Sequence, residues 1–313
     1  MEHELSAAAI PGDPFWPRAS EWLAGWHAPY AQRKLAVLGV PAATGSITPG
    51  RCDLAPAAVR EALHRFSTYD LESGDDLASI AAYDRGDLAV ERACVAEAFQ
   101  PIADGVRSSA KGVDALILLG GDNSITRAGV HGLDLALERC GLLTFDAHLD
   151  LRDLSGGLTN GNPVRALLRD GLPGRNIVQV GLQPFANSRV YHEVALDAGI
   201  SVITRGECHR LGIETVVERA LAQLSHHCEA IYVDFDIDVL DRAFAPACPG
   251  ARPGGITPAD LRSAARLCGE NPKVRIADLV EVDPECDVAR VTVYAACMCL
   301  LGFASGVVRR KHL

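Results

Sequence analysis

The sequence lacks long cationic runs and long apolar runs. Its longest stretch of lysine and arginine is Arg309-Arg310-Lys311, and the formal net charge of its 313 residues is -10. This balance argues against the basic surface that nucleic acid binding requires. The most apolar late stretch, Tyr294 to Val308, is shorter than the roughly 20 residues of a membrane helix. Because the segment from Met1 to Trp22 also lacks the apolar core of a secretory signal, we expect a cytoplasmic protein without nucleic acid or membrane partners.

Cysteine pairs at metal-binding spacing are also absent. The ten cysteines are scattered along the chain, and the tightest pair is Cys297 and Cys299. A zinc ribbon needs Cys-x2-Cys pairs, and cysteines spread singly through a long chain do not indicate a disulfide framework. We interpret most of them as small, buried apolar residues.

Short apolar runs alternate with longer segments of helical pattern from about Lys34 onward. The candidate strands are Leu35–Val40, Ala115–Leu119, Leu142–Phe145, Ile177–Val180, Ser201–Ile203, Ile231–Phe235 and Ile276–Val282. The candidate helices are Pro56–Arg65, Val90–Ser109, Ser124–Cys140, Val190–Ala198, Glu214–Leu224 and Pro258–Cys268, the last with Thr257 as its N-cap. Strands that are apolar throughout are typical of parallel sheets covered on both faces. The pattern predicts a three-layer α/β/α fold around a mostly parallel sheet.

No proline- or serine-rich linker and no break in composition divides the chain. The hydrophobic content of 48% is sufficient for a large core. We therefore predict one domain over residues 1–313, with an irregular N-terminal segment at 1–32.

Acidic clusters follow three of the candidate strands. They are Asp146-Ala147-His148-Leu149-Asp150, Asp234-Phe235-Asp236-Ile237-Asp238 and Glu281-Val282-Asp283. The carboxyl ends of parallel strands form the edge of the sheet where ligand sites assemble. Residues two apart in an extended segment point to the same side, so Asp146 and His148 can converge, with Asp150 as a further candidate, and so can Asp236 and Asp238.

Such crowded carboxylates repel one another unless a cation neutralises them. A set of oxygen ligands with one histidine favours manganese over zinc, iron or nickel. A single Asp-x-Asp after a strand is more often a solvated turn or a helix cap, and His148 alone would fit a structural role. Two such clusters and a histidine, all at strand ends, favour a metal site.

Five motifs occur in the order and spacing of a known family. They are Gly120-Gly121-Asp122-Asn123-Ser124, Asp146-Ala147-His148-Leu149-Asp150, Asp236-Ile237-Asp238-Val239-Leu240-Asp241, Pro253-Gly254-Gly255 and Glu281-Val282-Asp283-Pro284. From about Leu35 to Gly302 the chain resembles the ureohydrolases, the superfamily of arginases, agmatinases and formimidoylglutamases. The resemblance implies an arginase-like fold and a metal-dependent hydrolase of amidine or guanidine C–N bonds. It also implies a homo-oligomer.

The resemblance further implies two manganese ions per subunit, which activate water for attack on the substrate carbon. Their ligands would be Asn123, Asp146, His148, Asp150, Asp236 and Asp238. Asp146 and Asp236 would bridge the ions, and Asp150 would also transfer a proton to the leaving nitrogen. Glu281 would bind the cationic head of the substrate, so Asp150 and Glu281 are the expected catalytic residues.

Two positions depart from the pattern of the family. Asn123 stands where the family usually has a histidine ligand, and a neutral amide oxygen is a poorer donor, which would weaken one metal site. In Asn160-Gly161-Asn162-Pro163, an asparagine replaces the proton-transfer histidine of arginases and agmatinases. Formimidoylglutamases also lack this histidine.

The preferred substrate is therefore N-formimidoyl-L-glutamate, an intermediate of histidine degradation. An arginine beside the site could pair with its carboxylate; Arg152 is the first candidate and Arg165 the second, and Arg252 is a candidate for the entrance. Asn160, Asn162 and Glu281 complete the expected substrate-binding residues. The alternatives are a guanidine hydrolase such as agmatinase or guanidinobutyrase, and a non-catalytic relative with an impaired metal site.

Overall fold

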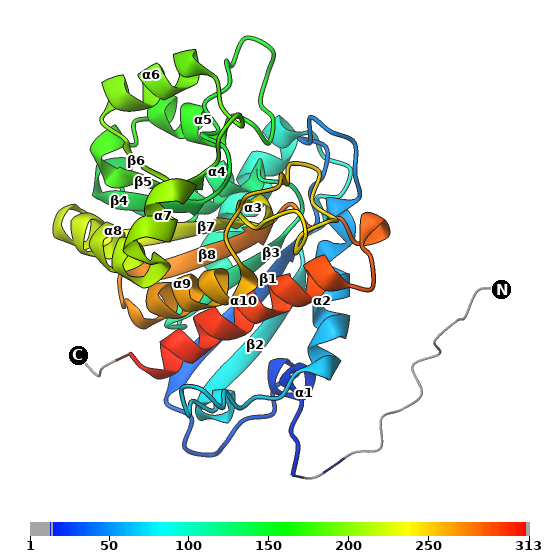
Figure 1. Cartoon of the computed structure of the whole chain (residues 1–313). Coiled ribbons are helices and arrows are strands. Elements are labelled where there is room, and N and C mark those ends of the chain that lie inside the picture. The colour runs from blue at the N-terminus through cyan, green and yellow to red at the C-terminus, as the bar shows by residue number, and fades with distance from the viewer. Residues whose placement is uncertain (1–12, 14, 311–313) are drawn as a thin grey trace.

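A single sheet of eight parallel strands forms the centre of the protein (Figure 1). The computed structural model describes residues 13 and 15–310. The strand order is β2-β1-β3-β8-β7-β4-β5-β6, and every adjacent pair is parallel. The strands are β1 (Arg33–Val40), β2 (Ile80–Asp87), β3 (Ala115–Gly120), β4 (Cys140–Phe145), β5 (Ile177–Leu182), β6 (Ser201–Thr204), β7 (Ala230–Asp236) and β8 (Val274–Val280). The predicted parallel sheet is confirmed.

Helices cover both faces of the sheet, as predicted for three layers. One face packs against α1 (Ala19–Leu23), α2 (Ala55–Ala62), α7 (Arg205–Leu211), α8 (Ile213–His227), α9 (Pro258–Glu270) and α10 (Val291–Val308). The other packs against α3 (Val95–Ser109), α4 (Ile125–His131), α5 (Pro163–Asp170) and α6 (Arg189–Ala198). Alternation along β1 explains the two cores, because Leu35 and Val37 join one while Ala36 and Leu38 join the other.

Several element boundaries differ from the prediction. The helix expected over Ser124–Cys140 ends at His131, and Cys140 already begins β4. The helix expected from Val90 begins at Val95, and the strand expected to reach Val282 ends at Val280. Thr257 caps α9 as predicted, since its hydroxyl accepts a hydrogen bond from the Asp260 amide.

The N-terminal segment predicted to be irregular, 1–32, contains the short helix α1. Residues 1–12 and 14 of that segment, and with them much of the stretch tested for a secretory signal, lie outside the described residues. The assignment of 1–313 to one domain stays a prediction.

The apolar C-terminal helix α10 belongs to the core. Among the described residues it is the one helix long and apolar enough to cross a membrane, by length and composition alone, and 72% of it is buried inside the molecule. It packs along α9 and α2, so its apolar character is explained by the helices and sheet that surround it.

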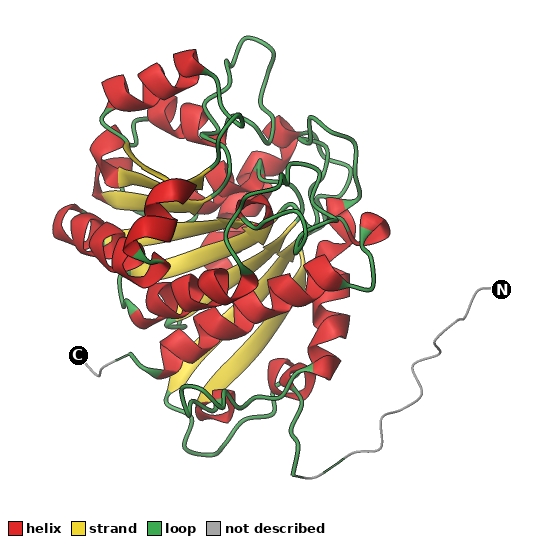
Figure 2. Ribbon diagram, in the orientation of Figure 1, coloured by secondary structure: helices red, strands yellow, loops and turns green. Residues whose placement is uncertain are grey.

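The four central strands, β3, β8, β7 and β4, are neighbours in the sheet although they are far apart in the sequence. Their carboxyl ends therefore lie side by side. Figure 2 shows long loops gathered at this edge of the sheet. This arrangement brings the loops that carry the acidic motifs into contact.

Candidate metal centre

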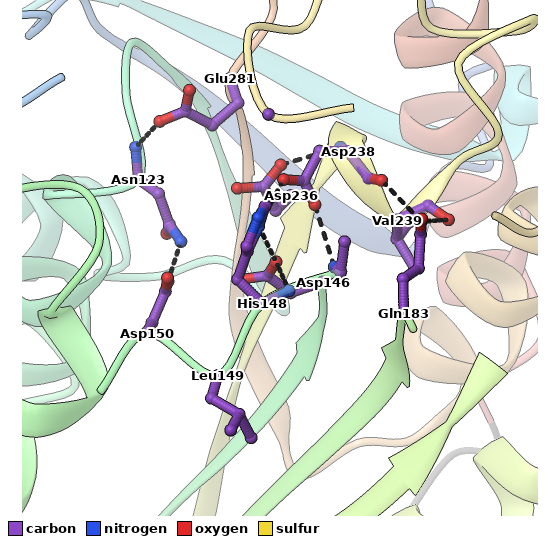
Figure 3. A network of polar contacts seen from close by, with 12 residues as sticks. Asn123, Asp146, His148, Leu149, Asp150, Gln183, Asp236, Asp238, Val239 and Glu281 are labelled. Atoms are coloured by element: carbon purple, nitrogen blue, oxygen red, sulfur yellow. Dashed lines mark hydrogen bonds and ion pairs between the residues drawn. The ribbon is translucent and has the colours of Figure 1, made fainter. Parts of the chain in front are cut away.

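The structure brings all six residues proposed as metal ligands to one edge of the sheet (Figure 3). Asn123 follows β3, and Asp146, His148 and Asp150 follow β4. Asp236 ends β7, and Asp238 lies in the single 3-10 turn after it. Glu281, the proposed substrate ligand, follows β8 and lies beside Asn123.

Hydrogen bonds and ion pairs hold the β4 and β7 loops together. His148 Nδ1 lies 2.8 Å from Asp238 Oδ2 and 3.4 Å from Asp146 Oδ1. Asp238 Oδ1 accepts a hydrogen bond of 2.9 Å from the amide of Ala147. Asp146, His148 and Asp238 offer ligand atoms that all lie within 4.8 Å of one another, a spacing that suits a shared cation.

A second set of contacts surrounds Asn123. Its backbone amide donates to Glu281 Oε1 at 2.8 Å, and its side-chain Nδ2 donates to Asp150 Oδ2 at 2.5 Å. Glu281 Oε1 also accepts from Asn160 Nδ2 at 3.0 Å. Asn123 thus joins the loops after β3, β4 and β8.

Burial makes ionisation of these carboxyl groups unfavourable. Burial, followed by the charge of Asp238, raises the pKa of Asp146 to about 6. Burial, followed by the charge of Asp122, raises the pKa of Glu281 to about 8. The pKa values of Asp150 and Asp236 are raised well above the ordinary 3.8, again mainly by burial. Without a cation, the cluster therefore retains protons.

His148 is subject to opposing influences. Burial lowers its pKa, but Asp238 and Asp146 outweigh burial and raise the pKa to about 11. Arg252 acts against protonation, because its guanidinium can only donate and lies 2.6 Å from His148 Nε2. A metal ion held through Nδ1 would likewise require a neutral imidazole.

These residues fit a pair of divalent cations. Five carboxyl groups, those of Asp146, Asp150, Asp236, Asp238 and Glu281, are each at most 7% exposed at this edge. One imidazole cannot balance them, whereas divalent ions would stabilise several ionised carboxylates together. Hard oxygen donors with a single nitrogen suit Mn²⁺.

Two of the side chains are carried by a strained backbone. Asp150 has a φ of 52° and Glu281 a φ of 66°, in the left-handed region that residues other than glycine rarely adopt. Hydrogen bonds hold both turns: the carbonyl of Asp150 accepts from the amide of Arg165, and the amide of Glu281 donates to the carbonyl of Gly121. Strain of this kind is typical of positions where function requires a particular direction of the side chain.

Gly250 leaves room for the cluster. A Cβ atom at this position would lie 2.4 Å from Asp238 Oδ2 and 3.3 Å from His148 Cε1. Even an alanine side chain would therefore displace Asp238, so the close approach of this loop depends on glycine.

A cavity of about 390 Å³ opens onto the cluster. Its lining includes His148, Asp150, Asp236, Asp238 and Glu281, together with Arg152, Asn160, Asn187, Tyr191 and Arg252. This volume is typical of a small-molecule site.

Two of the residues expected to bind the substrate do not line this cavity. Asn162 is buried, and its amide group bonds Gly157 O and the backbone amide of Thr159 within its own loop. We therefore assign Asn162 to the structure of the loop rather than to the substrate. Arg165, the second arginine candidate, is also not among the lining residues.

The site also contains residues that the sequence did not indicate. Asn187 clamps the β4 loop by accepting from the amide of Leu149 and donating to the carbonyl of Ala147. The sequence offered one signal for this residue, since Asn187 lies shortly after the carboxyl end of β5.

Of the ten cysteines, eight are buried as predicted. One of these, Cys248, places its sulfur within 4.8 Å of ligand atoms of Asp236 and Asp238.

Known proteins resemble this chain in sequence and in fold. The arginase family model matches residues 33–304. Formimidoylglutamase from Halalkalibacterium halodurans is 35% identical, over 86% of each chain. The crystal structure of formimidoylglutamase from Bacillus subtilis has a TM-score of 0.89 at 28% identity and covers 98% of this chain and 97% of its own. The structure of Trypanosoma cruzi formiminoglutamase with Mn²⁺ has a TM-score of 0.84 at 23% identity, over 95% of this chain and 100% of its own.

The family match spans most of the chain and includes every residue of the metal centre, and the 35% identical relative extends over a similar length. The resemblance predicted from the five motifs is thus confirmed, and the chain belongs to the arginase family.

Proposed function

We propose that this hydrolase converts N-formimidoyl-L-glutamate and water to L-glutamate and formamide. The observation that carries the proposal is a cavity that joins a carboxylate-rich metal centre to two arginines. An amidinium head and a dicarboxylate tail together match these two features. The 35% identity to a formimidoylglutamase supports the same substrate.

We assign two Mn²⁺ ions to Asn123, Asp146, His148, Asp150, Asp236 and Asp238. The fold neighbour from Trypanosoma cruzi was solved with Mn²⁺, and the ligand set suits this ion. When bound, the ions would lower the pKa of a water molecule and polarise the amidine.

Glu281 and Asp150 act on opposite ends of the bond that breaks. Glu281 is held by the amide of Asn123 and by Asn160 Nδ2, so its carboxylate is fixed where it can bind the amidinium head. Water adds to the amidine carbon, and the bond from this carbon to the glutamate nitrogen breaks. Asp150 carries the proton from water to that nitrogen, which leaves as the amine of glutamate.

The two arginines bind the carboxylates of the substrate. No side-chain hydrogen bond or ion pair engages the guanidinium of Arg152 among the described residues, although it lines the cavity. Arg252 donates to His148 Nε2 and to the carbonyl of Gly250. An imidazole that gives Nδ1 to a cation carries its hydrogen on Nε2, so metal binding would release Arg252 toward the substrate.

Replacing Arg152 with methionine is expected to raise KM for formimidoylglutamate by about 10- to 100-fold, with little change in kcat. This follows because a hydrogen bond to a charged group contributes about 1.5–3 kcal/mol. Steady-state kinetics would measure it. Arg139→Met is the matched control, since Arg139 pairs with Glu229 outside the cavity and its loss should leave KM unchanged. Equal KM values for the Arg152 variant and the wild type would exclude Arg152 as a carboxylate ligand.

A substrate panel tests the proposed activity. Manganese-loaded protein would be incubated with formimidoylglutamate, agmatine, arginine and guanidinobutyrate, and formamide and urea would be quantified. We expect formamide from the first substrate and no urea from the others. Urea from a guanidine would assign the chain to that substrate instead, and no turnover with any divalent metal would refute an enzymatic function.

A further inference from the structure

A chain of buried polar side chains lies directly behind Asn123. The hydroxyl oxygen of Thr126 is 2.7 Å from Asn123 Oδ1 and 2.8 Å from Asp278 Oδ2. Asp278 Oδ2 also accepts a hydrogen bond of 2.6 Å from the hydroxyl of Tyr232. Thr126, Asp278 and Tyr232 are completely buried. They belong to α4, β8 and β7, so the chain connects the metal centre to the middle of the sheet.

These buried side chains have too few hydrogens to make a hydrogen bond of every close contact. The Thr126 hydroxyl carries one hydrogen, but it faces the amide oxygen of Asn123 and a carboxylate oxygen of Asp278. When Asp278 is ionised, one of these close oxygen–oxygen contacts has no hydrogen. Exchanging the amide oxygen and nitrogen of Asn123 removes the conflict. Nδ2 then donates to Thr126, and Thr126 donates to Asp278.

The same exchange changes what Asn123 presents to the metal centre. At present Nδ2 donates to Asp150 Oδ2 at 2.5 Å. After the exchange, the amide oxygen of Asn123 would face this oxygen of Asp150, and once Asp150 is ionised, as a metal ligand must be, two oxygens without a hydrogen repel each other. A cation that both oxygens contact would turn this repulsion into attraction. The two orientations of the amide therefore suit the metal-free and metal-bound centre, respectively.

We propose that Thr126 is a positioning residue that turns the amide oxygen of Asn123 toward Asp150, where the two oxygens would together hold a metal ion. It does so by accepting a hydrogen bond from Nδ2 while it donates its own hydrogen to Asp278. The inference rests on the proposed metal centre. It explains how an asparagine can serve where the family usually has histidine, because the buried chain favours the orientation in which the amide oxygen faces Asp150.

Calorimetric titration of the metal-free, full-length protein with Mn²⁺ tests this role. We expect two equivalents to bind to the wild type. Thr126→Val should weaken one of them by about 10- to 100-fold, the usual effect of losing a partner of a metal ligand, and leave the other unchanged. Thr126→Ser retains the hydroxyl and should restore the affinity of the wild type.

Two controls separate positioning from a structural contribution. Tyr232→Phe removes the other hydroxyl that donates to Asp278 Oδ2 but does not touch Asn123, so it should lower the Tm of the metal-free protein without changing either metal affinity. In an Asn123→Ala background there is no amide to orient. Adding Thr126→Val to that background should have no further effect on Mn²⁺ binding.

The outcomes distinguish this inference from the proposed function. If Thr126→Val binds both ions as tightly as Thr126→Ser, or if its effect persists in the Asn123→Ala background, Thr126 does not position the amide. If the wild type binds no Mn²⁺, the proposed metal-dependent function fails, and the inference fails with it.

Discussion

Replacing Asp236 with asparagine is expected to lower kcat/KM by about 10³-fold or more, because a metal centre contributes several kcal/mol to the transition state. Asp236 is 4% exposed, ends β7 and lies beside Asp238, where it is proposed to bridge the two ions. An uncharged amide would bind both ions weakly. Steady-state assays at saturating Mn²⁺, together with metal analysis, would measure the loss of turnover and of bound metal.

Asp241→Asn is the matched control for this substitution. Asp241 belongs to the same motif, but its carboxylate accepts hydrogen bonds from the amides of Ala243 and Gly254 and does not line the cavity. The amide oxygen of an asparagine can accept one of these bonds, and the other is lost outside the cavity, so activity and metal content should stay close to those of the wild type. Equal activities of the two variants would contradict a bridging role for Asp236.

Metal-free protein is expected to lose stability as the pH rises from about 5 to about 8. The pKa of Glu281 is raised from 4.5 to about 8, and that of Asp146 from 3.8 to about 6. Between these limits the folded protein binds more protons than the unfolded chain, so the free energy of unfolding falls with pH. Asp238, whose pKa is lowered, changes the free energy of unfolding only at pH values near and below its ordinary pKa of 3.8. Differential scanning calorimetry with a chelator would measure the decline in Tm.

Manganese should remove this decline, because the ions replace the protons as partners of the carboxylates. At a concentration about 1,000 times Kd, one ion adds about 4 kcal/mol, which corresponds to roughly 6 °C in Tm for a chain of 313 residues. In Glu281→Gln the metal-free decline should be shallower. A metal-free Tm that is constant or rises over this pH range would show that the carboxyl groups do not retain protons.

Much of the site could be predicted from the sequence because each ligand lies at or shortly after the carboxyl end of an apolar strand. The run Leu142–Phe145 precedes Asp146, and Ile231–Phe235 precedes Asp236, so the sheet order alone brings the two acids together. Asp146 and His148, two residues apart in the sequence, also come together in the structure, where their ligand atoms lie within 4.8 Å of each other.

Other features depend on contacts between distant segments or on the position of a strand in the sheet, which a local sequence pattern does not indicate. Strand β2 was missed because it is an edge strand whose second half is exposed and polar, Tyr83-Asp84-Arg85-Gly86-Asp87. Asn162 resembled a site residue because it belongs to the motif of Asn160, but its side chain serves its own loop. Thr126 and Asp278 meet only when β8 is placed beside β3, and they are 152 residues apart in the sequence.

Some predictions concern the surroundings of the protein rather than its site. The homo-oligomer, the cytoplasmic location and the absence of nucleic acid and membrane partners stay predictions. The small-molecule substrate is supported by the family to which the chain belongs.

The electron paramagnetic resonance spectrum of the wild type loaded with two equivalents of Mn²⁺ tests the central claim most directly. Asp146 and Asp236 are proposed to bridge the ions, and bridged Mn²⁺ ions couple magnetically. We predict the broadened spectrum of a coupled pair, which should disappear in Asp236→Asn. A spectrum of isolated Mn²⁺ ions, or of manganese free in solution, would contradict a shared centre built from the β4 and β7 loops.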